Sequence, residues 1–207
     1  MNKTAINRTS LKEQISEIIL NRIFEGELKP GDRLKELAIA KEFGTSQAPV
    51  REALRSLESQ GYLRHKTHSG TTVILLETKE IKEINQIREA MEIQALTDGL
   101  TTIQETVYRL DEINDRLPSG NETQVMTDDE HFHKIILEAY DNERMMELWQ
   151  TLTNKLRISR SRLNESNLID QIPVLDDSIL QAIKSGNTRK ATQQLKQYYV
   201  LWNPVNN

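Results

Sequence analysis

Three polar side chains at a regular spacing could read the edges of DNA bases. Gln47, Arg51 and Arg55 are four residues apart, so on a helix they lie along one face. Arginine on such a face can donate two hydrogen bonds to guanine, and glutamine can pair in a similar way with adenine. A solvated helix surface carries the same residue types, so the spacing leaves both interpretations open until the neighbouring elements are considered.

The segments around these residues predict three short helices and a hairpin. A first helix is expected to end at Gly26 and the turn at 29–31. Its apolar face consists of Leu11, Ile15, Ile18, Ile19 and Ile23. A second helix is expected over 35–43, and a third begins after Ser46, its expected N-cap. Strand-like residues then flank a polar tip at 66–70. This order is that of a winged helix-turn-helix, which favours base reading by the third helix.

Three runs of sequence in this region resemble one family of regulators. Residues 30–34 read PGDRL, residues 43–54 read FGTSQAPVREAL, and residues 57–63 read LESQGYL. They are similar to the DNA-binding domain of the GntR superfamily of bacterial transcription regulators, over residues 11–75. The resemblance implies that double-stranded operator DNA is contacted by the third helix and the wing, through Ser46, Gln47, Ala48, Arg51, Arg55, Lys66, His68 and Gly70.

Two positions depart from the family pattern. Members usually carry arginine where this chain has Gln47, and the position of Leu37 is often polar or basic in relatives. We therefore expect the operator to differ at the base pair that residue 47 reads, and one contact to the DNA backbone to be missing.

From residue 77 onward the apolar spacing predicts helices alone. About six of them, with short connections, make an antiparallel all-α bundle large enough to enclose a core. The expected protein is mainly α, with a winged helix-turn-helix domain at 1–77 and a helical domain at 78–207. Met145, Trp149 and Trp202 are expected in the core or in a dimer contact.

The helical half resembles the FadR-type effector-binding domain, called FCD. Residues 129–133 read DEHFH and are followed by Asn142, which is similar to the D-x-x-F-H…N signature of that domain. Arg88 and Glu92 match the Arg-x-x-x-Glu of its first long helix. The resemblance covers residues 79–202, and six helices favour the shorter, VanR-like variant.

The FCD resemblance implies a divalent metal, such as Zn, Ni or Mn, and a carboxylate effector. Asp129 and His133 are four residues apart and can reach one ion from a shared helix face. Two further histidines are expected where this chain has Asp176 and Tyr198, of which Asp176 can still ligate. A metal-free effector pocket, a helix ion pair and a purely dimerising domain remain alternatives. His131 points elsewhere and is expected at the surface.

An effector site is also expected around Arg88 and Glu92. Arg88 could hold an anionic effector with two parallel hydrogen bonds. An intrahelical ion pair between Arg88 and Glu92 is an equally open interpretation.

Composition and missing motifs exclude several classes of protein. The chain has no cysteine, and neither a membrane-length apolar run nor the apolar core of a signal peptide is visible, so we expect a cytoplasmic protein without a membrane partner. Residues 1–77 carry 12 Lys and Arg against 10 Asp and Glu, whereas the remainder carries 15 against 21. A metal-assisted hydrolase is disfavoured because a phosphate-binding glycine loop, H-E-x-x-H and a serine elbow are all lacking.

These observations together predict a sequence-specific transcription regulator and not an enzyme. We expect a homodimer on a pseudo-palindromic operator, because one recognition helix reads only a few base pairs. The expected action is repression, modulated by a small-molecule effector in the helical domain.

Overall fold

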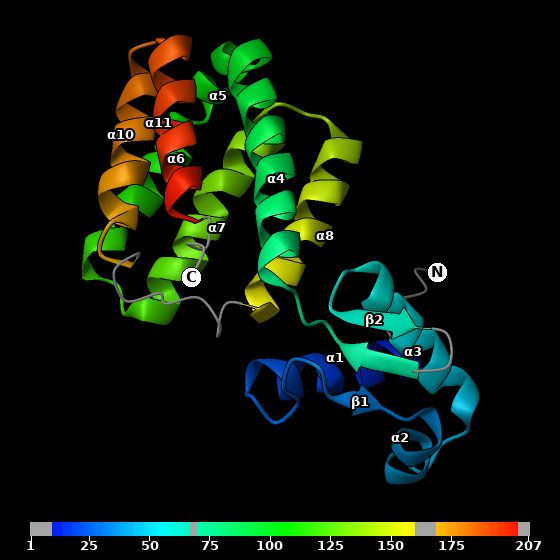
Figure 1. Cartoon of the computed structure of the whole chain (residues 1–207). Coiled ribbons are helices and arrows are strands. Elements are labelled where there is room, and N and C mark those ends of the chain that lie inside the picture. The colour runs from blue at the N-terminus through cyan, green and yellow to red at the C-terminus, as the bar shows by residue number, and fades with distance from the viewer. Residues whose placement is uncertain (1–9, 67–69, 160–168, 203–207) are drawn as a thin grey trace, which may run out of the picture. The chain divides into compact units, whose positions relative to one another are not determined.

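The computed structural model describes residues 10–66, 70–159 and 169–202. These residues are mainly helical and divide into two compact units (Figure 1). The first contains the described residues up to Leu75 together with Thr153–Ser159, and the second contains the rest.

The first unit contains three helices, α1 (Leu11–Phe24), α2 (Glu36–Glu42) and α3 (Gln47–Ser59). Ser10 caps α1, because its hydroxyl accepts from the Glu13 N–H while the Glu13 carboxylate accepts from the Ser10 N–H. The buried stripe of α1 is narrower than expected: it comprises Ile15, Ile19 and Ile23, whereas Leu11 and Ile18 are exposed. Ile18 lies about 100° around the helix from Ile19, outside that stripe.

Helix α3 buries the side that its apolar residues predict, and it packs against α1 and α2. The buried residues are Val50, Ala53, Leu54 and Leu57. Ser46 occupies the N-cap position of α3, as expected, although its side chain makes no capping hydrogen bond. The end of the later helix α8 (Glu143–Ser159) belongs to this unit, where Asn154 Nδ2 donates to the Gln60 carbonyl.

A three-stranded antiparallel sheet completes the first unit. Its strands are β1 (Arg33–Leu34), β2 (Leu63–Lys66) and β3 (Gly70–Val73), in the order β1-β3-β2. The hairpin of β2 and β3 was expected, but β1 was not, because two residues are too few for alternation to be visible. Gly70 has a φ of +79°, and a Cβ there would lie 3.2 Å from the Arg33 guanidinium.

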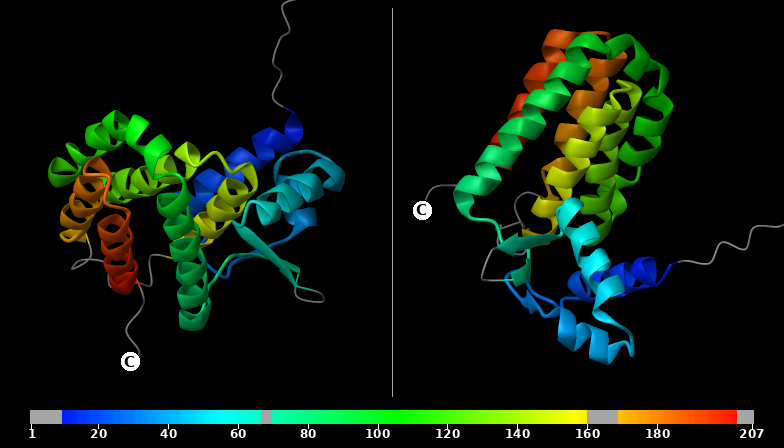
Figure 2. Two further views of the ribbon diagram at one scale, coloured as in Figure 1. Left: turned by 90° about the horizontal axis from the view of Figure 1, so that it is seen from above. Right: turned by 90° about the vertical axis from the view of Figure 1, so that its right-hand side faces the viewer.

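The described part of the second unit is all-helical apart from its connections. It comprises α4 (Thr78–Asp98), α5 (Leu100–Glu105), α6 (Val107–Asn114), the 3₁₀ turn η1 (Leu117–Ser119), α7 (Glu122–Ala139), the part of α8 up to Leu152, α10 (Ile172–Lys184) and α11 (Thr188–Leu201). The longer helices run alongside one another as a bundle (Figure 2). Helix α5 was not expected as a separate element.

One glycine permits the close approach of α4 and the end of α7. Gly99 lies between α4 and α5, and a Cβ at this position would come within 2.8 Å of the Tyr140 ring.

Among the described helices, none combines the length and apolar character that crossing a membrane requires.

Candidate functional sites in the two units

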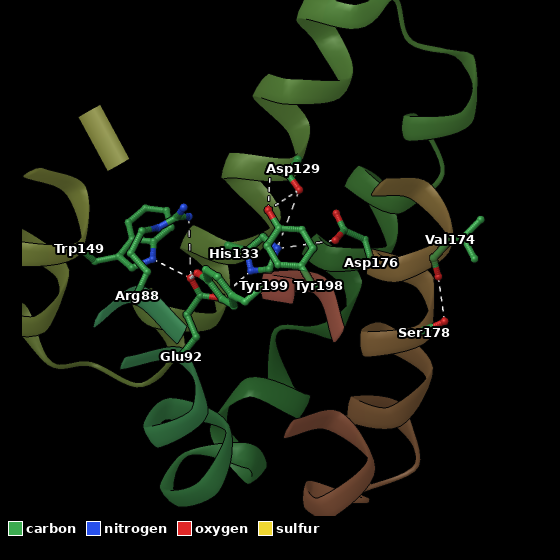
Figure 3. Close-up of polar contacts among 10 residues, drawn as sticks. All are labelled: Arg88, Glu92, Asp129, His133, Trp149, Val174, Asp176, Ser178, Tyr198 and Tyr199. Carbon is green, nitrogen blue, oxygen red and sulfur yellow. Dashed lines mark hydrogen bonds and ion pairs between the residues drawn. The ribbon is translucent and has the colours of Figure 1, made fainter. Parts of the chain in front are cut away.

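A cluster of charged and aromatic side chains is buried inside the helical bundle (Figure 3). It draws on α4, α7, α8, α10 and α11, and its members are Arg88, Glu92, Asp129, His133, Trp149, Asp176, Tyr198 and Tyr199. No member is more than 3% exposed. Burying so many charges costs several kcal/mol for each ion unless each is paired, so such a cluster is typical of a binding site.

Glu92 contacts several other members of the cluster through its carboxylate. One carboxylate oxygen accepts hydrogen bonds from Trp149 Nε1 at 2.7 Å and from the Tyr199 hydroxyl at 2.6 Å. The other oxygen lies 2.6 Å from His133 Nδ1. Burial alone would raise the pKa of Glu92, but the His133 ring, Arg88 and the Tyr199 hydroxyl outweigh it and lower that pKa. Both oxygens are therefore occupied by protein groups.

His133 turns its second ring nitrogen toward two aspartates. Its Nε2 atom lies 3.6 Å from Asp176 Oδ1 and 3.9 Å from Asp129 Oδ1, too far for hydrogen bonds. Nε2 and both Asp176 oxygens are buried, and none of the described residues is hydrogen-bonded to them. Burial alone would lower the pKa of His133, but Glu92 and Asp176 raise it to about 10. Burial together with Asp129 raises the pKa of Asp176 to about 7, against the opposing effect of His133.

Asp129, His133 and Asp176 have the arrangement of a divalent metal site. Their ligand atoms all lie within 4.8 Å of one another. A histidine that binds a metal commonly gives its other nitrogen to a carboxylate, as His133 does to Glu92. A metal ion at Nε2 would replace the proton that the raised pKa keeps on the His133 ring. With that ring neutral, the three carboxylates and the Arg88 guanidinium leave two negative charges in excess, which a divalent cation would neutralise. The donor set therefore fits such an ion.

Tyr198 holds Asp129 in place. Its hydroxyl lies 2.8 and 3.0 Å from the two Asp129 oxygens, and its ring centroid lies 4.2 Å from that of His133. Burial and the Asp129 charge keep the pKa of Tyr198 well above its usual value, so the hydroxyl acts as a donor to the carboxylate. The position where the family resemblance implies a histidine is thus occupied by a side chain that orients Asp129, one of the candidate metal ligands.

Arg88 is buried, and not all of its N–H donors form hydrogen bonds with the described residues. Its guanidinium lies over the rings of Trp149 and Tyr199, with its central carbon 5.0 and 5.7 Å from their centroids. The intrahelical partner Glu92 is 3.9 Å from Nη2, and Nε has no hydrogen-bond partner among the described residues. This geometry is compatible with both expected roles of Arg88, an effector contact and an intrahelical ion pair, because the ion pair with Glu92 is long and leaves donors available.

The signature residues around the cluster have different roles. His131 is exposed, and Asn142 accepts from the Met145 N–H, which caps α8. Met145 is half-buried, while Trp149 and Trp202 are buried. The sequence interpretation assigned Trp149 to the core without its hydrogen bond to Glu92 and did not single out Tyr199. No spacing rule connects α8 or α11 with α4.

An open groove lies on the surface of the bundle. Its volume is about 690 Å³, and its lining includes Ile87, Ala90, Met91 and Met145. It contains no member of the buried cluster.

The first unit presents the predicted polar face of α3. Gln47, Arg51 and Arg55 are exposed on the side of α3 away from its buried stripe, and Ser46 and Ala48 are exposed at its beginning. Arg51 is tied to Glu36, the first residue of α2, with Nε and Nη2 each 2.9 Å from Oε2.

At the wing, Lys66 is exposed and pairs in register with Gly70. His68, which was also expected at this tip, lies outside the described residues.

The fold and these two sites define a class of protein. A helix-turn-helix with a wing presents α3 for the major groove, and a separate helical unit encloses a polar site. Residues 11–73 match the sequence profile described as "Bacterial regulatory proteins, gntR family", and residues 83–200 match the FCD domain. The chain therefore belongs to the GntR family of bacterial transcription regulators, in the branch with an FCD domain. Its relatives are regulators and not enzymes.

Relatives resemble the chain over most of its length. The uncharacterized HTH-type transcriptional regulator YdhC of Bacillus subtilis is 29% identical over 185 residues, which cover 86% of this chain and 82% of YdhC. A probable D-xylose utilization operon transcriptional repressor of Paenarthrobacter nicotinovorans is 27% identical over 97% of this chain and 90% of that protein.

Solved structures share the fold. A putative transcriptional regulator GntR from Rhodococcus sp. RHA1 has a TM-score of 0.73 and 26% identity, over 93% of this chain and 95% of the other. E. coli McbR/YncC has a TM-score of 0.68 and 22% identity, over 94% and 95% of the two chains.

Proposed function

We propose that this protein is a homodimeric repressor that binds a pseudo-palindromic operator and responds to a small carboxylate in its helical unit. The exposed row of Gln47, Arg51 and Arg55 on α3 supports sequence reading, with Lys66 and the wing on the phosphates. Two-fold symmetry doubles the number of base pairs read. Repression is the action in the names of two relatives, the D-xylose utilization repressor and the gluconate operon repressor of B. subtilis.

In this proposal, residues 1–77 bind DNA. Residues 78–207 bind the effector and the second subunit. A bacterial regulator of this kind meets the chromosome in the cytoplasm, which is its proposed location.

One observation carries the proposal of a ligand site. The buried Nε2 of His133 and both oxygens of Asp176 lie together without hydrogen-bond partners among the described residues. Leaving buried charged groups unpaired is expensive, so these atoms suit the binding of a positive ion. We assign Asp129, His133 and Asp176 as its ligands, with Glu92 and Tyr198 orienting them. A bound divalent ion would supply a positive charge to which a carboxylate can coordinate.

Arg88 is the proposed second contact for the effector. Its charge is buried, its Nε has no hydrogen-bond partner in the described part of the chain, and its ion pair with Glu92 is long, at 3.9 Å. A carboxylate ligand would satisfy these donors with two parallel hydrogen bonds. Glu92, the other residue expected to bind the effector, is proposed to orient His133 instead, because its oxygens already accept three contacts.

Regulation requires that the effector bind one arrangement of the dimer more tightly than another. An effector that binds both equally would leave the operator affinity unchanged. The alternative in which the helical unit only dimerises therefore predicts an operator affinity that no carboxylate alters.

The metal content and thermal stability of the purified full-length protein test the ligand site. Measurements are made after chelation and after addition of Zn²⁺, Ni²⁺ or Mn²⁺. We expect bound metal and a raised Tm in the wild type, and the loss of both in His133→Ala. His131→Ala is the matched control, because His131 is an exposed histidine on the same helix. Equal metal binding by the two variants would refute the assignment.

The operator is tested separately by selection from random duplexes. The proposed function predicts a two-fold symmetric consensus and a dimer in solution by light scattering. Recovery of no consensus would refute operator recognition, whatever the metal experiment shows.

A further inference from the structure

A carboxylate from the preceding helix holds the guanidinium of Arg51. Glu36 is the first residue of α2, and Arg51 lies in the second turn of α3. Nε and Nη2 of Arg51 each lie 2.9 Å from one oxygen, Oε2 of Glu36. The side chains are 49% and 33% exposed, so the pair lies at the surface.

This pair leaves part of the guanidinium available. A guanidinium carries five N–H donors in a rigid plane, and Glu36 takes the edge formed by Nε and Nη2. Both Nη1 donors and one Nη2 donor remain. Two such donors side by side are what the O6 and N7 atoms of guanine require.

We propose that Glu36 positions Arg51 for base reading and so sets sequence specificity at the base pair that Arg51 contacts. The inference rests on the proposed operator binding by α3. An arginine held before binding loses less rotamer freedom when it contacts a base. Glu36 also cancels the charge that Arg51 would otherwise offer to any phosphate, which weakens attraction to unrelated DNA. Both effects raise the preference for the correct sequence.

The variant Glu36→Gln tests this role, because it keeps the size of the side chain and removes its charge. Affinities are measured for the operator selected by the wild type, for the same duplex with the base pair read by Arg51 replaced, and for an unrelated duplex. We expect the preference for the original base pair to fall about two- to tenfold, since one immobilised side chain accounts for roughly that factor. Binding to the unrelated duplex should become stronger.

Glu42→Gln is the matched control. Glu42 lies at the other end of α2 and pairs with Arg22 of α1, so the variant makes the same charge change on the same helix without touching Arg51. We expect it to change the affinity for all three duplexes alike. A Glu36→Gln effect caused only by loosened helices would have this uniform pattern and would overturn the inference.

Arg51→Ala and the double variant Glu36→Gln/Arg51→Ala complete the test. If Glu36 acts through Arg51, adding Glu36→Gln to Arg51→Ala leaves the base preference unchanged. Wild-type base preference retained in Glu36→Gln would refute the positioning role, and a sharper preference would show that Glu36 instead withholds Arg51 from DNA. A wild type that selects no operator would overturn the proposed function itself, which separates the two failures.

Discussion

Replacing Asp176 by asparagine should stabilise the metal-free protein and abolish its response to metal. The Asp176 carboxylate is fully buried, neither oxygen has a hydrogen-bond partner among the described residues, and its nearest cationic group is His133 Nε2 at 3.6 Å. An unpaired buried group costs roughly 1–3 kcal/mol and more when it is charged, and Asn keeps nearly the same shape while removing the charge, so we expect a gain of this order. At about 2–4 °C per kcal/mol for a chain of this size, the Tm in chelator should rise by roughly 2–12 °C.

Added metal should stabilise the wild type and leave the Tm of Asp176→Asn almost unchanged. At a free metal concentration of about 100 times Kd, binding contributes roughly 2.7 kcal/mol, which raises the wild-type Tm by about 5–11 °C. Asp176→Asn lacks one of three ligands and should show almost no shift. The assay is a thermal melt followed by circular dichroism in EDTA and in Mn²⁺ or Ni²⁺.

Asp177→Asn is the control for this prediction. Asp177 is the next residue on α10, and it accepts hydrogen bonds from Asn114 and Gln181, away from the cluster. It should keep the wild-type response to metal. A full metal-induced shift in Asp176→Asn, or a lowered Tm of that variant in chelator, would refute the reasoning from the unpaired carboxylate.

Three further outcomes are expected. Lys66→Ala should weaken binding to all DNA sequences and reduce the slope of log affinity against log salt by about one, as measured by fluorescence anisotropy; an unchanged slope would remove the wing from the phosphate contacts. Tyr198→His replaces the clamp on Asp129 by a metal ligand, so Ni²⁺ affinity should rise about tenfold or more in competition titrations, and an unchanged or weaker affinity would contradict this. Trp149→Phe removes a buried donor to Glu92 and should lower the free energy of unfolding by about 1–3 kcal/mol in a urea titration, whereas no loss would show that this hydrogen bond is unimportant.

Local periodicity made much of the fold predictable. The buried stripe of α3 and the hairpin of β2 and β3 were expected because their spacing repeats within a few residues. Strand β1 and helix α5 were missed. The former is two residues long, and the latter follows α4 with only Gly99 between them, so neither leaves a pattern of its own.

The candidate sites were likewise predictable only where their residues lie close together in the sequence. Asp129 and His133 share a helix face by their spacing, and Arg51 belongs to a recognisable run, so the sequence by itself determined these candidates and the family. Tertiary structure alone decided that Glu92 binds Trp149 and Tyr199, that Tyr198 clamps Asp129 and that Glu36 holds Arg51. Each of these contacts joins different helices, and their geometry depends on how the helices pack.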